Sequence, residues 1–124
     1  MSFRISSTTN EDYMFFSAVG PVSEEALVEL GTAIHRDCNS KKIKNAIVDC
    51  ALMEGALSGG RLYFAVQKFV EAVGYAIKVA YINPPSHWIP DDDEFSRDVA
   101  KNQGGFLEMF ASESEAVAWL RAVR

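Results

Sequence analysis

The chain has 124 residues, which is enough for one domain with a single hydrophobic core, expected to span residues 1–124. A net charge of −5 and a pI near 5.0 argue against binding to nucleic acid or to an anionic membrane surface. No apolar run approaches the roughly 20 residues that a membrane span needs. Cys38 and Cys50 are too few for a disulfide framework, and the N-terminus lacks the apolar core of a signal peptide, so a cytoplasmic location is expected.

The first half of the chain predicts a hairpin, a helix and a buried strand. Weak alternation over 3–7 and an aromatic, β-branched run over 13–20 predict two strands joined by a short turn. Ser23 is suited to cap a helix over 23–38, whose apolar residues Leu27, Leu30 and Ile34 fall on one face. The apolar run at 43–50, bounded by polar residues, is typical of a central strand buried on both faces.

The second half predicts alternating helices and strands. Leu62, Val66, Phe69 and Val73 recur at helical spacing, which predicts a helix over 61–74 with Gly74 just past its end. Ser112 and Glu115 form the pattern of a capping box at the start of the last helix. The remaining expected elements are a strand over 75–82, a helix over 90–105, a strand over 106–111 and the final helix over 112–124.

The resulting order is ββαβαβαβα, which predicts an α/β fold. Strands that alternate with helices form mostly parallel sheets, so we expect five strands, parallel except for the initial hairpin, and four main helices. Ligands on such sheets usually bind beyond the carboxyl ends of the strands. The expected loop over 51–60 follows the carboxyl end of the third strand, so its position makes it a candidate site.

The loop contains the sequence GALSGGRL, which resembles a phosphate-binding P-loop only in part. Gly55 and Gly60 have the required spacing, but a P-loop continues with Lys and then Ser or Thr. Here these positions are Arg61 and Leu62, and leucine cannot ligate magnesium, so P-loop nucleotide chemistry is excluded. Ser58 is placed to cap the following helix, where a phosphate on its hydroxyl would also meet free N–H groups.

Over its whole length the chain resembles STAS-type domains, the SpoIIAA-like family that includes bacterial anti-sigma factor antagonists. In that family a strand ending in Asp is followed about nine residues later by a Ser or Thr that a partner kinase phosphorylates. Asp49 and Ser58 stand at that separation, and Gly60 falls where the helix-opening glycine is expected. The family's acidic residue before the serine is Leu57 here, and Gly59 replaces a small polar residue.

The C-terminal part is similar to a SpoIIAA-like, CRAL-TRIO-like subgroup of small bacterial proteins. This likeness rests on Phe95, Gly104, Phe110, Ala116, Trp119 and Leu120. Members of that subgroup mostly lack an assigned biochemical role, so the resemblance implies a fold more than a function.

Two hypotheses of function follow. The first is a non-catalytic regulatory or protein-interaction domain, phospho-regulated at the loop, whose partner is a regulatory kinase or an anti-sigma-like protein. Its site residues are Ser58, Gly59, Gly60, Arg61 and Tyr63. The alternative is a module that binds an apolar or anionic small molecule between the 51–60 loop and the 83–90 loop. Its pocket residues are Asp49, Leu57, Trp88 and Ile89, and the apolar Leu57 suits a pocket wall better than a kinase-recognised loop.

Other chemistry is not indicated. His35 and His87 have no partner at metal-ligand spacing, and the acidic run at 91–94 is explained by its place at a helix start, so no metal or other cofactor is expected. There is no G-x-S-x-G motif. Cys50 follows Asp49, whose charge would raise the pKa of the thiol. Tyr63 is expected to point away from the core, where a homodimer partner would meet it.

Overall fold

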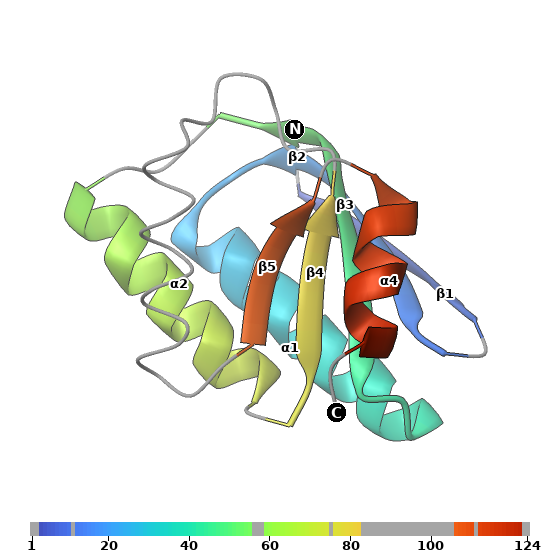
Figure 1. Ribbon diagram of the computed structural model, residues 1–124. Helices are drawn as coiled ribbons and strands as arrows, with labels where there is room; N and C mark the ends of the chain where they lie inside the picture. The colour runs from blue at the N-terminus through green and yellow to red at the C-terminus, as the bar shows by residue number, and fades with distance from the viewer. Residues whose placement is uncertain are drawn as a thin grey trace.

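The computed structural model describes residues 3–10, 12–55, 59–74, 76–82, 106–110 and 112–122. In these residues a five-stranded sheet carries helices on both faces (Figure 1). The elements in chain order are β1 (Arg4–Thr9), β2 (Met14–Pro21), α1 (Glu24–Lys41), β3 (Asn45–Glu54), α2 (Gly59–Val73), β4 (Lys78–Ile82), β5 (Phe106–Phe110) and α4 (Glu113–Ala122). The helix expected over 90–105 lies outside the described residues. None of the described helices has the length and apolar character needed to cross a membrane.

The strands lie in the sheet in chain order, β1-β2-β3-β4-β5. Strand β1 pairs with β2 in antiparallel fashion, and the other three pairings are parallel. The backbone N–H of Asn10 donates to the carbonyl of Tyr13 at 2.9 Å and closes the β1–β2 hairpin. The expected fold, a mostly parallel five-stranded sheet that begins with a hairpin, is therefore confirmed.

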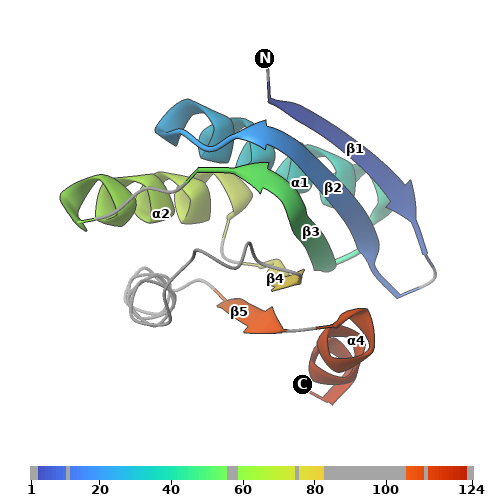
Figure 2. The same cartoon turned by 90° about the horizontal axis from the view of Figure 1, so that it is seen from above.

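The sheet separates two hydrophobic cores. Helices α1 and α2 lie side by side on one face, and α4 lies on the other, as Figure 2 shows from above. Because side chains alternate along a strand, β2 sends Met14, Phe16 and Ala18 toward α1 and α2. The core beneath α4 is smaller and contains Tyr13, Ile47, Ala80, Ile82, Ala116 and Leu120.

Helix α1 begins as its sequence predicts and ends later. The Ser23 hydroxyl oxygen accepts a hydrogen bond from the backbone N–H of Ala26 at 3.0 Å, which is the geometry of an N-cap. Leu30 and Ile34 are buried on the sheet-facing side. The helix continues beyond the expected residue 38 because its end is closed by Lys42, whose backbone is left-handed with φ of 59°.

Helices α1 and α2 approach closely at Gly31. A Cβ atom placed on Gly31 would lie 2.9 Å from both the Cβ of Ala72 and the carbonyl oxygen of Phe69. Helix α2 ends at Val73 and is followed by Gly74, as expected. Gly74 has a φ of +90°, and its N–H donates to the Val70 carbonyl at 2.9 Å.

Helix α4 is capped at its start and attached to the sheet at its end. At its start, the Ser112 hydroxyl oxygen accepts from the N–H of Glu115 at 3.4 Å, which confirms Ser112 as the cap. At its end, the Lys78 ammonium donates to the carbonyls of Trp119 and Leu120, at 3.4 and 3.1 Å, and lies 4.7 Å from the centre of the Trp119 ring.

Candidate functional site

The carboxyl ends of the parallel strands lie at the same end of the sheet, and β3 extends furthest there. Its last pairing with β4 joins Asp49 to Ile82, whereas its pairing with β2 continues to Glu54, opposite Pro21. The backbone N–H of Val22 also donates to the Glu54 carbonyl at 2.8 Å. The expectation of a loop over 51–60 is therefore wrong for its first part, because residues 51–54 continue the strand that pairs with β2.

A β-bulge explains why this extension was hard to recognise. From Ser17 to Val19 strand β2 advances two residues, while β3 advances three, from Asp49 to Leu52. The extra residue shifts the side-chain alternation, so that Cys50 and then Met53 point into the core under α1 and α2. Leu52 is consequently turned outward, and 62% of its surface is exposed.

Asp49 forms a local hydrogen bond at the bulge, and the strand continues beyond it. One carboxylate oxygen of Asp49 accepts a hydrogen bond from the backbone N–H of Ala51, two residues later, at 3.0 Å. The residue is half-buried opposite Ser17 and lies before the bulge, so the strand end expected at this position is wrong. Leu57, Trp88 and Ile89, the other residues of the expected pocket, lie outside the described residues.

The turn between β3 and α2 begins at Gly55. Its φ of +79° is a left-handed conformation that glycine adopts without the strain of a Cβ atom. Ser58 lies outside the described residues, and α2 begins directly after it, at Gly59. Gly60, Arg61 and Tyr63 all lie in the first turns of this helix, and Arg61 is exposed. The side chain of Tyr63 lies outside what the structure describes.

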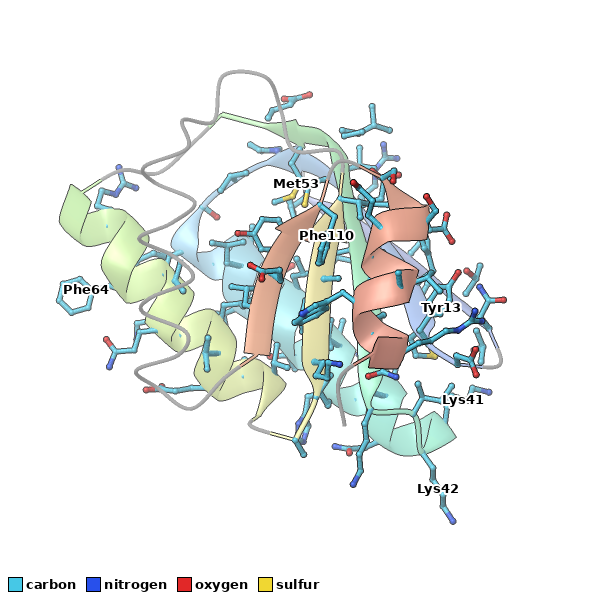
Figure 3. All side chains as sticks on the ribbon, viewed as in Figure 1. Tyr13, Lys41, Lys42, Met53, Phe64 and Phe110 are labelled. Atoms are coloured by element: carbon cyan, nitrogen blue, oxygen red, sulfur yellow. The ribbon has the colours of Figure 1, made fainter. Side chains whose placement is uncertain are left out.

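Two exposed apolar side chains flank this turn. Among the described residues, the large hydrophobic side chains with high exposure are Leu52, at the end of β3, and Phe64, in the first half of α2 and 56% exposed. Figure 3 shows Phe64 projecting from α2, away from the sheet. We call residues 52–64 the switch segment. Leu52 lies at its start and Phe64 at its end, and the charged side chains of Glu54 and Arg61 between them are also exposed.

Sequence reasoning singled out Tyr63 on α2 and not Phe64, although Val66, Phe69 and Val73 face the core at helical spacing and leave Phe64 on the outward side. Sequence reasoning missed Leu52. Only the bulge turns this residue outward, and the pairing partner of the strand decides where a bulge forms.

The cysteine and histidine side chains of the described part do not form a reactive centre. Burial, and then the charge of Asp49, raises the pKa of Cys50 well above its usual range, and burial, with Asp37, raises the pKa of Cys38 to about 11. His35 lies on the surface of α1. Its Nδ1 atom lies 3.0 Å from the Val73 carbonyl oxygen, and the amide nitrogen of Asn39 lies 3.0 Å from its Nε2 atom. Among the described residues, no three His, Cys, Asp or Glu side chains form a metal site.

The arrangement described above defines an α/β fold. Its marks are an antiparallel hairpin followed by parallel strands in chain order, two helices on one face of the sheet, and the C-terminal helix on the other. The chain has the SpoIIAA-like fold, as comparison with solved structures shows.

Two solved structures illustrate the likeness. One is an uncharacterised protein of the DUF3478 family with a SpoIIAA-like fold from Shewanella loihica PV-4, with 22% sequence identity and a TM-score of 0.57, covering 95% of this chain and 93% of that one. The other is the anti-sigma factor antagonist SpoIIAA in its unphosphorylated form, with 16% identity and a TM-score of 0.50, covering 98% of this chain and 100% of that one. No protein-family model matches the chain, and no curated protein matches its sequence.

Proposed function

We propose that this protein is a non-catalytic regulatory domain that binds a protein partner through the switch segment, and that phosphorylation of Ser58 controls this binding. The observation that carries the proposal is the exposure of Leu52 and Phe64, which lie before and after Ser58 in the sequence. Exposed leucine and phenylalanine side chains favour a partner surface, because covering them removes apolar area from water.

The position of Ser58 supports regulation by phosphate. Ser58 directly precedes α2, so a phosphate on its hydroxyl would lie near the free N–H groups and the positive end of the helix dipole. It would also add close to two negative charges between Glu54 and Arg61. SpoIIAA, which shares the fold, is an anti-sigma factor antagonist that has an unphosphorylated form, and this supports a partner of the anti-sigma or kinase type.

The proposal is tested by affinity purification of the tagged full-length protein from the cells that produce it, with quantitative mass spectrometry of what is retained. The variants are Phe64→Glu and Ser58→Asp. The control is Ser40→Glu, which adds the same charge as Phe64→Glu at an exposed position near the end of α1.

We expect a partner that the wild type and Ser40→Glu retain equally, that Phe64→Glu loses at least about tenfold, and whose amount Ser58→Asp changes. A partner set that is the same for all four proteins would contradict the proposal. Retention that depends on Phe64 but not on Ser58 would leave the binding surface in place and remove the phosphate from it.

A further inference from the structure

Strand β1 forms one edge of the sheet, and the direction of its backbone groups follows from the hairpin. Residues facing each other in an antiparallel pair alternate between hydrogen-bonded and non-hydrogen-bonded pairs. The bond from Asn10 to Tyr13 fixes this alternation, so Arg4, Ser6 and Thr8 bond to β2. The N–H and C=O groups of the alternate residues, Ile5, Ser7 and Thr9, consequently point away from the sheet.

The side chains of these alternate residues lie on the α1 side of the sheet. Ile5 pairs with Ala18 and packs against the core under α1 and α2. The hydroxyl of Ser7 donates to Asp37 of α1 at 3.3 Å. The residues with outward backbone groups therefore also border the space between β1 and α1.

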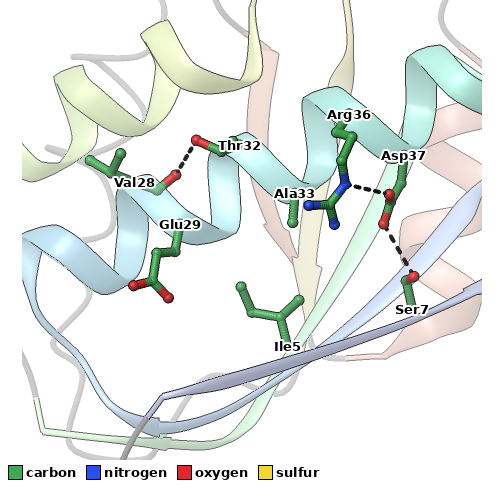
Figure 4. A pocket seen from close by; sticks show the side chains of 8 residues that line it. All are labelled: Ile5, Ser7, Val28, Glu29, Thr32, Ala33, Arg36 and Asp37. Carbon is green, nitrogen blue, oxygen red and sulfur yellow. Dashed lines mark hydrogen bonds and ion pairs between the residues drawn. The ribbon is translucent and has the colours of Figure 1, made fainter.

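That space is an open groove with a volume of about 380 Å³, drawn in Figure 4. The volume lies at the small end of the roughly 300–1,000 Å³ range of ligand sites. The groove is lined by the apolar side chains of Ile5, Val28 and Ala33 and by charged side chains of α1. An edge strand beside a helix is the setting in which extended peptides add to a sheet, because the strand supplies backbone bonds and the groove receives alternate side chains.

The two ends of the groove differ in charge. At one end, Asp37 accepts hydrogen bonds from Ser7 and from the guanidinium of Arg36, at 3.3 and 3.0 Å, so its charge is compensated. Toward the other end, Glu29 points into the space beside Ile5, as Figure 4 shows, and has no hydrogen-bond or ion-pair partner among the described residues. A basic side chain would complement it.

The edge also lacks the features that usually block strand addition. Proteins protect exposed edges with lysine, proline or a bulge. The sequence of β1 is RISSTT, its register with β2 is regular, and Arg4 is its single charged residue. Because Arg4 follows the opposite alternation to Ile5, its side chain lies on the other face of the sheet.

We propose that β1 and α1 bind an extended, basic peptide segment of a protein partner, which adds to the sheet as a strand beside β1. Alternate side chains of the peptide enter the groove, and a lysine or arginine among them meets Glu29. A second copy of this chain fits less well, because the residues that its β1 would offer on this face, Ile5, Ser7 and Thr9, carry no charge for Glu29. This groove is distinct from the switch segment.

The test uses a phage-displayed library of random decapeptides, selected on the full-length protein. Selected sequences are then made as labelled synthetic peptides, and their affinities are measured by fluorescence polarisation. The central variant is Ser7→Pro, which removes an outward N–H without breaking a β1–β2 bond and which an edge strand tolerates. Its matched control is Ser7→Ala, which removes the hydroxyl bond to Asp37 but keeps the N–H. Glu29→Lys, at an exposed helix position, tests the charge without touching the strand.

We expect peptides with alternating apolar residues and at least one basic residue. Their affinity should fall about tenfold in Ser7→Pro and about fivefold in Glu29→Lys, and change less than about twofold in Ser7→Ala. The proposal is overturned if no peptide is enriched, if Ser7→Pro binds as tightly as the wild type, or if Ser7→Ala loses binding equally. If Ser7→Pro does not fold, unchanged binding by Glu29→Lys overturns it. Phe64→Glu should bind these peptides normally, which separates this groove from the switch segment.

Discussion

The hydroxyl of Tyr13 donates a 2.6 Å hydrogen bond to the carboxylate of Glu113, joining residues 100 positions apart in the chain. Tyr13 lies just before β2, and Glu113 opens α4. At the other end of α4, the guanidinium of Arg121 bonds to Asp12 at 2.7 Å. These two bonds connect the N-terminal hairpin to the C-terminal helix on the face of the sheet opposite to α1 and α2.

Tyr13→Phe is expected to lower the free energy of unfolding by about 1 kcal/mol near pH 8, because the phenyl ring keeps the packing but loses the hydrogen bond. The bond to Glu113, burial and the charge of Glu113 raise the pKa of Tyr13 from 10.0 to about 12. The bond stabilises only while the hydroxyl holds its proton. Its contribution is therefore complete below pH 10 and is lost as the pH rises through about 12.

Urea unfolding of both proteins near pH 8 and near pH 11 measures this dependence. We expect the difference between wild type and Tyr13→Phe to shrink at the higher pH. A difference that stays constant would contradict the role of the Glu113 bond.

Gly31→Val is expected to destabilise the protein by about 2–3 kcal/mol. The new Cβ atom would lie 2.9 Å from the Ala72 side chain and the Phe69 carbonyl, so the two helices would have to move apart. Thr32→Val is the control, since it places the same side chain at the next, exposed position of α1 and should change stability by less than about 1 kcal/mol. Equal thermal stability of the two variants would show that the helices are not packed as described.

Phe64 and Phe69 both lie on α2, but the side chain of Phe64 is exposed and that of Phe69 is buried. Phe69 is 7% exposed and Phe64 is 56% exposed. Phe69→Ala should cost about 3–5 kcal/mol of stability, since it leaves a cavity in the core. Phe64→Ala should change stability by less than about 1 kcal/mol while it weakens partner binding. If chemical denaturation gave equal losses, Phe64 would be a packing residue, and the proposed surface would lose its main support.

The thiols of Cys38 and Cys50 are expected to react slowly in the folded protein. Burial raises the pKa of both Cys38 and Cys50, so each stays protonated and enclosed at neutral pH. In the native protein, both should react with a disulfide reagent near pH 8 far more slowly than free cysteine. In guanidinium chloride both should react at once. Rapid labelling of either thiol in the native state would be inconsistent with its burial.

Much of the fold was predictable because local signals agreed with the tertiary structure. Ser23 caps α1, Gly74 ends α2, and Ser112 caps α4, each in a geometry that depends on neighbouring backbone groups. The apolar spacing of α2 placed Val66 and Phe69 in the core. These features extend over a few residues, so the sequence around them is sufficient to specify them.

The parts that were missed depend on contacts between distant segments. Strand β3 continues to Glu54 because β2 lies beside it. The bulge after Asp49 breaks the side-chain alternation from which the strand could have been predicted. The outward turn of Leu52 and the groove between β1 and α1 follow from the same kind of long-range pairing. No periodicity in residues 51–54 carries that information.

The proposed switch is tested most directly by mass spectrometry of the endogenous protein. Trypsin cleavage after Lys44 and Arg61 releases one peptide, residues 45–61, that contains Ser58. We predict a fraction phosphorylated on Ser58 that changes between growth conditions, together with a change in the amount of partner retained. Recovery of this peptide in unmodified form under every growth condition would contradict regulation by phosphate at Ser58.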